Sequence, residues 1–342
     1  MNTQTKVGAA VAAALLVVGI TYAVVPSPAT CQPDPSVAIA ALPSGGTFTG
    51  TGCYNVPNGI RITQPVTING GIYNDPSTTG AVGVGYGGIQ PVISIRDTHN
   101  VTLKNLSIVG GNPDGGYHSS QVGQTGIRVL SSDHVTIANV RTSNTFGDGL
   151  TLFADLPKNK NPVSNLVVSN LTVTHAGRQG VTTAALSNAV LTNVNVVSAA
   201  AVGLDAESDL TGIGMGHVTF NHLTAKGINL IDFLTGPIVF NNSVMSGHVV
   251  IGKASTFPIT VNHGTLTLPS SSHGYPPAGI YMPHGGNLTF AGTAVTRPLP
   301  NYGQPAGLTW QLMEGAHLTF VGTPAPTPPG TNDATSTVTV TP

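Results

Sequence analysis

Two carboxylates stand two residues apart in the middle of the sequence, and this spacing could support acid–base chemistry. Asp205 and Glu207 occupy alternate positions of a strand-like segment, so both side chains would leave one face, with Cα atoms roughly 6.6–7 Å apart. Hydrolysis of a glycosidic bond needs two such groups, one acting as acid and the other as base or nucleophile. Only 13 of the 342 residues are acidic, so solubility alone does not account for such a pair.

A second chemistry is open to the same residues if the substrate carries a uronic acid. β-Elimination needs a cation on the sugar carboxylate and a base at the adjacent carbon. Ca²⁺ prefers carboxylate oxygens, so Asp209 together with Asp205 is a candidate metal site and Ca²⁺ a candidate cofactor. Arg178 is the candidate base, although a guanidinium ordinarily keeps its proton. A third interpretation is a solvated surface cluster in which Arg178 pairs with Asp205 and Glu207.

These residues fall within a repeat that must position them. Each copy reads polar–apolar–x–apolar–x–Asn–apolar–x–apolar, and the period of two indicates strands. The marker residues of successive copies are Asn105, Asn139, Asn170, Asn193 and His222. One unit cannot bury its own apolar side, whereas stacked units can. In such a stack each Asn amide can bond the copies above and below, so we expect a ladder of these side chains along one turn.

A second strand, led by a glycine, follows each copy. Aligning these strands predicts columns of neighbours about 4.8 Å apart. The inward apolar column consists of Ile127, Leu150, Val181, Leu204 and Ile228. The outward column consists of Arg128, Thr151, Thr182, Asp205 and Asn229. Two residues further along the strands, the outward positions include Phe153 and Glu207.

The alignment gathers hydrogen-bonding side chains and one aromatic ring around the two carboxylates. Arg178 and Gln179 directly precede one strand, and Asp148 precedes the strand before it. Sugars are bound by such groups, so the column predicts a carbohydrate groove, with the loop 112–124 as its wall. The candidate catalytic residues are Asp205, Glu207 and Arg178. The candidate substrate-binding residues are Asp148, Gln179, Phe153, Asn229 and Thr182.

Through these repeats, the sequence resembles the right-handed parallel β-helix proteins of the pectate-lyase-like superfamily. The resemblance covers roughly residues 89–251, and weaker strands extend it on both sides. It implies an all-β fold: a single-stranded right-handed parallel β-helix with capped ends and irregular terminal loops. It also implies a polysaccharide partner and, in the lyases, an arginine base. The polygalacturonase pattern is absent, because Asn144-Thr145-Phe146 stands where Asn-Thr-Asp would be expected.

The N-terminus predicts export. Lys6 precedes an apolar stretch, Val7 to Val25, and then Ser27-Pro28-Ala29, which is the pattern of a signal peptide over residues 1–29. The apolar stretch is also close to the roughly 20 residues that span a bilayer, so an uncleaved signal anchor is the alternative. Either way the rest of the chain would lie outside the cytoplasm, where Cys31 and Cys53 can form a disulfide.

Composition limits the remaining function classes. Only 7% of residues are charged and the formal net charge is −1, which excludes a nucleic-acid-binding surface. We expect a β-helix domain over residues 30–322 and a Pro/Thr-rich disordered tail over 323–342. Two functions stay open: a secreted protein that cleaves a polysaccharide as lyase or hydrolase, and a non-catalytic surface or receptor-binding rod. Contact with a membrane would come only through an uncleaved N-terminal segment.

Overall fold

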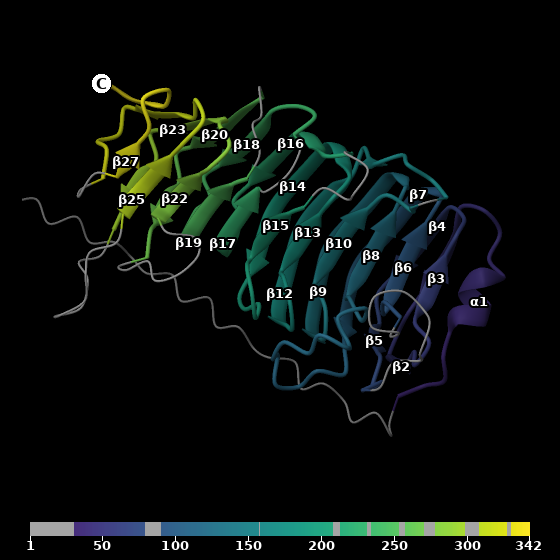
Figure 1. Cartoon of the computed structure of the whole chain (residues 1–342). Helices are drawn as coiled ribbons and strands as arrows, with labels where there is room; N and C mark the ends of the chain where they lie inside the picture. Colours follow the sequence, from purple (N-terminus) through teal and green to yellow (C-terminus); the bar gives the residue numbers. More distant parts are fainter. Residues whose placement is uncertain are drawn as a thin grey trace, which may run out of the picture.

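Parallel coils stack along one axis to form an elongated rod (Figure 1). The computed structural model describes residues 31–78, 90–156, 158–207, 213–230, 234–252, 257–269, 278–297, 308–326 and 330–342. Every pairing between strands in these ranges is parallel, and each coil pairs with the coil before it and the coil after it. The predicted all-β solenoid is therefore confirmed.

Three sheets run the length of the rod, and the first carries the candidate site. The first sheet contains β3 (Ile60–Ile62), β6 (Ile93–Arg96), β8 (Ile127–Leu130), β10 (Leu150–Phe153), β13 (Val181–Thr183), β15 (Leu204–Ala206), the end of β17 (Thr224–Leu230) and of β19 (Val244–Ile251), β22 (Ala278–Met282), β25 (Leu308–Leu312) and β27 (Thr331–Asn332). In Figure 1 most of these strands lie on the face toward the viewer.

The second sheet lies behind the first and contains the longest strands. Its members are β1 (Gly46–Thr49), β4 (Val66–Asn69), β7 (His99–Val109), β9 (Asp133–Thr145), β11 (Val163–Ser164), β12 (Val167–Ala176), β14 (Leu186–Val196), β16 (Met215–Asn221), β18 (Ile238–Asn241), β20 (Pro258–Asn262), β23 (Asn287–Ala291), β26 (His317–Val321) and β28 (Thr337–Thr341).

The third sheet is formed by short strands and by the ends of longer ones. It contains β2 (Cys53–Asn55), β5 (Ile72–Asn74), the second halves of β7, β9, β12 and β14, the starts of β17 and β19, β21 (Thr265–Thr267) and β24 (Ala294–Thr296). The long strands thus bend from the second sheet into the third, and the repeat asparagines lie at the bend.

The bend explains why asparagine recurs there. Asn105, Asn139, Asn170 and Asn193 have φ between 54° and 57°, a left-handed conformation that asparagine tolerates better than most residues. Each amide nitrogen donates to the side-chain oxygen of the preceding coil, at 3.0 Å from Asn139 to Asn105, 2.8 Å from Asn170 to Asn139 and 2.9 Å from Asn193 to Asn170. The predicted ladder is confirmed, and His222 continues the left-handed position with φ 56°.

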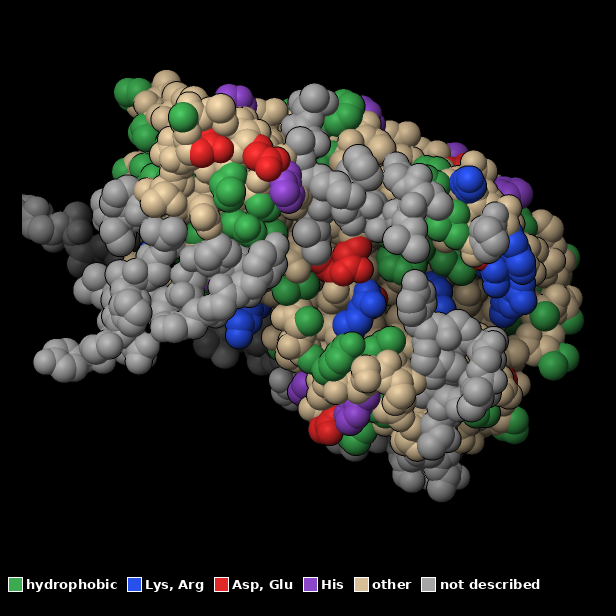
Figure 2. Space-filling model, in the orientation of Figure 1, with side chains coloured by type: hydrophobic (Ala, Val, Ile, Leu, Met, Phe, Trp, Pro, Cys, Tyr) green, Lys and Arg blue, Asp and Glu red, His purple; other side chains and the backbone are tan. Residues whose placement is uncertain are grey.

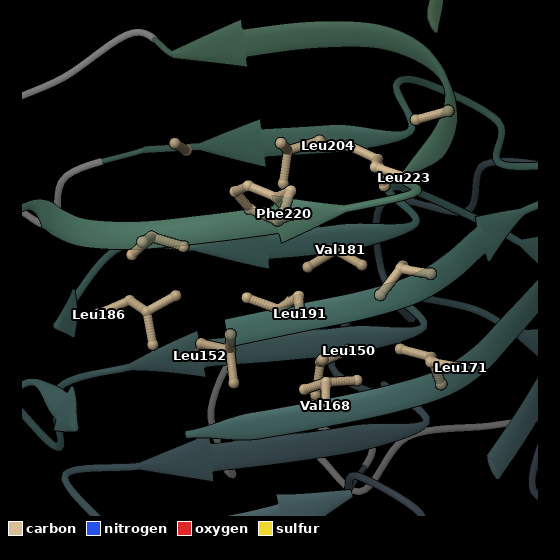
Figure 3. Packing of buried hydrophobic residues seen from close by; sticks show 14 of the residues in the cluster. Leu150, Leu152, Val168, Leu171, Val181, Leu186, Leu191, Leu204, Phe220 and Leu223 are labelled. Carbon is tan, nitrogen blue, oxygen red and sulfur yellow. The ribbon is translucent and has the colours of Figure 1, made fainter. Parts of the chain in front are cut away.

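The core is the apolar interior of the coils. The predicted inward column of Ile127, Leu150, Val181, Leu204 and Ile228 is buried throughout. Figure 3 shows several of these side chains meeting Leu191 and Phe220 of the second sheet inside the rod. Each coil alone would leave this surface in water, so its burial depends on the coils stacking in register.

The N-terminal end is closed by a short helix, α1 (Ser36–Ala40), whose Ile39 is buried against the first coils. Cys31 and Cys53 form the predicted disulfide, which holds Cys31 and Gln32 against β2. The predicted signal segment, residues 1–29, lies outside the described residues. Within the ranges given above, no helix is long and apolar enough to cross a membrane.

The C-terminal end differs from the prediction made from composition. The segment 323–342, predicted to be a disordered tail, carries β27 and β28, and β28 pairs with β26 over five residues. The physical reason is the Thr–Val alternation of Thr337–Thr341, which suits a strand once an edge is available for pairing. The stack of coils therefore continues into this segment.

Candidate functional site

The candidate site lies on the outward side of the first sheet, where β10, β13, β15 and β17 are neighbours. Thr151 pairs with Thr182, Thr182 with Asp205, and Asp205 with Asn229, as the sequence alignment predicted. Figure 2 shows acidic and basic side chains meeting near the middle of this face. The register therefore brings together residues that are 78 positions apart in the sequence, from Thr151 to Asn229.

The outward column is much less exposed than the alternation suggested. Asp205 and Thr182 are 0% exposed, and Thr151 is 2% exposed. Their side chains leave the interior of the coil but bond to groups that precede the strands, which removes them from solvent. Phe153 was predicted to be an exposed platform, but its side chain is half-buried. It pairs in register with Leu130 at the far end of the strands.

Asp148 acts as the anchor of Arg178. One carboxylate oxygen accepts hydrogen bonds from Arg178 Nε at 2.9 Å and from the backbone N–H of Gln179 at 3.2 Å. The other accepts from the hydroxyl of Thr151 at 3.1 Å. These partners use much of the hydrogen-bonding capacity of a carboxylate whose side chain is only 3% exposed. Asp148 is thus suited to hold Arg178 in place rather than to contact a ligand itself.

Arg178 is the fixed positive charge of the site. Its side chain is 25% exposed, so part of the guanidinium reaches solvent. Burial by itself would lower the pKa of Arg178, but the charge and hydrogen bond of Asp148, together with the charge of Glu207, outweigh it and raise the pKa above its ordinary value. A guanidinium in this setting is a poor proton acceptor, which favours a binding role for Arg178 over the role of base.

Gln179 orients Asp205. Its side-chain oxygen accepts a hydrogen bond from Thr182 Oγ1 at 2.7 Å, and its amide nitrogen donates to Asp205 Oδ2. Asp205 Oδ1 is buried without a hydrogen-bond partner of ordinary geometry in the described part of the chain. Glu207 and Asn229 are the polar neighbours of this carboxyl group.

The environment of Asp205 favours its protonated form. Burial first, and then the neighbouring Glu207 carboxyl, raise the pKa of Asp205 to about 8, while Asn229 and Arg178 offset part of the effect. Glu207 lies two residues further along the chain and is half-buried. The site therefore pairs a buried, proton-holding carboxyl with a partly exposed one, beside a fixed guanidinium.

The predicted calcium site is not assembled from the described residues. Asp209 lies outside them. In the ranges that the structure describes, no group of three or more His, Cys, Asp or Glu side chains could hold a metal ion. An open hollow lined by Gly322, Thr323, Pro324 and Val340 lies at the C-terminal end of the rod and includes none of the site residues.

Two polar clusters near the site were missed from the sequence. Arg96, at the end of β6, makes a two-point ion pair with Asp155, whose carboxyl comes from the loop after β10. Asp75 accepts a hydrogen bond from Gln124 at 2.9 Å, and both are buried. Partners 59 and 49 residues apart meet only through loop conformations, so no repeat or motif points to them.

The sequence matches the family described as "Right handed beta helix region" over residues 90–295, which is more than half of the chain. None of the curated protein sequences compared with the chain matches it significantly. Two solved structures have similar folds. One is an alginate lyase from Paenibacillus sp. str. FPU-7, at 11% identity and a TM-score of 0.51, covering 90% of this chain and 96% of that one.

The other is the catalytic domain of an alpha-1,3-glucanase of glycoside hydrolase family 87, solved in complex with tetrasaccharides. It is 11% identical with a TM-score of 0.53, and the match covers 86% of this chain and 63% of that chain, slightly less than two thirds of its length. At such identities the likeness shows the fold alone, and this fold carries several different activities. Together with the stacked parallel coils, the match over residues 90–295 shows that the chain belongs to the right-handed β-helix family.

Proposed function

We propose that this protein cleaves an extracellular polysaccharide at the cluster formed by Asp205, Glu207 and Arg178. The observation that carries the proposal is the unequal pair of carboxyl groups, Asp205 with no exposed surface and Glu207 partly exposed, beside a fixed guanidinium. Neighbouring acids in different environments are typical of sites that carry out acid–base catalysis. The disulfide supports a location outside the cytoplasm.

The geometry supports a division of roles among these residues. Glu207 is the carboxyl group with surface available to a substrate, so it is the catalytic residue of the pair. Asp205 has no exposed surface, so it acts on Glu207 as a positioning residue that holds a proton beside it. Arg178, held by Asp148, would bind a sugar hydroxyl or carboxylate with the exposed part of its guanidinium. Gln179 keeps Asp205 in place.

Hydrolysis is better supported than elimination. An eliminating enzyme of the predicted kind would use Arg178 as base, and the neighbouring Asp148 and Glu207 hold the proton on that guanidinium. In hydrolysis, the oxygen of a water molecule bonds to the anomeric carbon and that water gives up one proton, while the bond to the leaving oxygen breaks and that oxygen takes up one proton, so that one water is consumed in all. The products are then new reducing ends, with no new carbon–carbon double bond.

The test is incubation with a panel of neutral and uronate-containing polysaccharides. We expect new reducing ends without the absorbance of an unsaturated product. Glu207→Gln should lower the rate about 100-fold or more, since general acid–base groups contribute about 10²–10⁴-fold. Glu314→Gln is a matched control, because its side chain is 60% exposed at the C-terminal end and its rate should stay within about twofold of the wild type.

A non-catalytic rod is the second candidate, and the complete burial of Asp205 favours it. In that case the cluster would be a polar network that stiffens the wall of the β-helix. Absence of cleavage across the panel would overturn the enzymatic proposal. Absorbance of an unsaturated product would instead replace hydrolysis with elimination.

A further inference from the structure

The loop 110–125, between β7 and β8, is fixed by buried polar side chains rather than by apolar ones. Asn112 and Gln124 are 0% exposed. Asn112 donates to the carbonyl oxygens of Gly116 at 2.9 Å and Thr145 at 3.2 Å. Gln124 accepts from the N–H of Gly111 at 2.9 Å and donates to Asp75. A surface loop with this many buried hydrogen bonds is held in one conformation.

This loop packs against the turn that carries Arg178. A Cβ at Gly177 would lie 2.8 Å from the carbonyl oxygen of Gly116, so the two backbones touch. The N–H of Arg178 donates to the oxygen of Gly147 at 3.2 Å, and the N–H of Gly147 donates to the oxygen of Gln124 at 2.8 Å. The loop is therefore joined to the candidate site by direct backbone contacts.

Tyr117 is the exposed aromatic residue of this fixed loop. Its side chain is 60% exposed, although the next residue, His118, packs edge-on against Phe146 with ring centroids 5.3 Å apart. Tyr117 follows Gly116 and Arg178 follows Gly177, so each is one residue, about 3.8 Å of backbone, away from the contact between the two glycines. A large aromatic surface thus stands in water on the loop whose backbone touches the turn that leads to Arg178.

We propose that Tyr117 is a stacking platform for a pyranose ring of the polysaccharide, one or more units away from the bond that is cleaved; this rests on the proposed function. A tyrosine ring offers an apolar face to the C–H groups of a sugar, while its hydroxyl stays in water or bonds a sugar hydroxyl. Because the loop is already ordered and a tyrosine has only two side-chain torsions, little entropy is lost on binding.

The test compares Tyr117→Ala and Tyr117→Phe, each in the Glu207→Gln background, so that binding is measured without cleavage. The readout is retardation in native gels that contain the polysaccharide cleaved by the wild type. We expect Tyr117→Ala to weaken binding about tenfold and Tyr117→Phe to stay within about threefold, since the ring face is retained. In the cleaving protein, Tyr117→Ala should raise KM with kcat little changed.

Phe257→Ala provides the control for loss of an exposed ring, because Phe257 is 37% exposed in the turn before β20, several coils away. It should bind as the parent does. The inference is overturned if Tyr117→Ala binds as tightly as its parent while the parent is clearly retarded. If no polysaccharide retards any variant in the gel, and none is cleaved by the wild type, the proposed function fails together with the inference.

Discussion

At the scale of single residues, the stability of the fold depends on whether the buried carboxyl group of Asp205 is protonated or charged. Its oxygen Oδ2 accepts from Gln179, its neighbours in register are Thr182 and Asn229, and it has no exposed surface. Ionising this group places a charge in a region shielded from water, beside the carboxyl of Glu207. The proton therefore matters to the folded state whatever the protein does with a substrate.

A pH series tests this point. The folded-state pKa of Asp205 is raised from 3.8 to about 8, so between these values the folded protein binds more protons than the unfolded chain. The contribution of this group to the free energy of unfolding must then fall as pH rises through that window, and stay flat above it. We expect the free energy of unfolding of Asp205→Asn to equal that of the wild type near pH 4. Above pH 8 it should be higher than that of the wild type by about 1 kcal/mol or more, measured by urea unfolding.

Asp155→Asn is a control for which stability relative to the wild type should change with pH in the opposite sense. Burial opposes the charge of Asp155, but the hydrogen bonds and charge of Arg96 lower the pKa of that carboxyl overall. Its stabilising effect is present above the pKa of the unfolded chain and is lost on acidification. Asp155→Asn should therefore weaken the protein at neutral pH and converge with the wild type in acid. Parallel pH curves for wild type and Asp205→Asn would contradict the assignment of a raised pKa.

Residue neighbours could be predicted from the sequence, but residue environments could not. Alternation and the leading glycines fix which residues share a column, and the pairing of Thr182, Asp205 and Asn229 followed the prediction. Alternation says only that a side chain leaves the coil. Whether it then meets water or another polar group depends on Gln179, which lies outside the strands.

At the scale of elements, the asparagine ladder combines two separate requirements at one bend. Asn170 must adopt φ 55°, and its amide must bond Asn139 on one side and Asn193 on the other. His222 meets the first requirement with φ 56° in the coil after that of Asn193. The backbone conformation is therefore the stricter demand, and the amide bonds add to it.

Substitution at Asn170 separates the two. Asn170→Ala loses both amide bonds, at about 0.5–1.5 kcal/mol each, and must also hold alanine in the left-handed region at about 1–2 kcal/mol. Asn170→Gly loses the bonds alone, so it should be less destabilised by about 1 kcal/mol in urea unfolding. Asn195→Ala, on the third sheet and outside the ladder, is the control. Equal stabilities for the alanine and glycine variants would mean that the backbone conformation contributes nothing.

The repeated strands could be predicted because the spacing of the repeat indicates how the coils stack. The loops could not, because their conformations depend on residues far away in the sequence. The spacing of Asn139, Asn170 and Asn193 already implied a stack with one shared bend. The loop 110–125 takes its shape from Asp75, in an earlier coil. The C-terminal strands were missed for a related reason, since Thr337–Thr341 gains its order only by pairing with β26.

At the scale of the whole molecule, each coil contacts chiefly its two neighbours, so stability is distributed along the rod as a series of local interfaces. The N-terminal interface is reinforced by α1 and by the Cys31–Cys53 disulfide, which closes a loop of 22 residues. A perturbation at this end should reach the first coils and fade with distance along the stack.

Reduction of the disulfide tests that expectation. Closing a loop of this length stabilises a protein by about 3 kcal/mol in the chain-entropy description. After reduction, we expect faster amide hydrogen exchange in β1 and β2 and little change in β20 to β28, followed by mass spectrometry of peptides. Cys31→Ser should reproduce the pattern without reductant. A uniform increase along the whole chain would show that the rod opens as one cooperative unit instead.

The outward positions of the second sheet have a consequence for how such a molecule can change its length. Thr219, Val239, Thr260, Thr289 and Thr319 occupy one column in unbroken register, so successive coils match one another along this sheet. Deleting one complete coil would bring its two neighbouring coils together in the same register and shorten the rod by about 4.8 Å. Removing one residue from inside a strand would instead turn the side chains that follow it in that strand to the opposite face. The length of the rod can therefore change in steps of one whole coil.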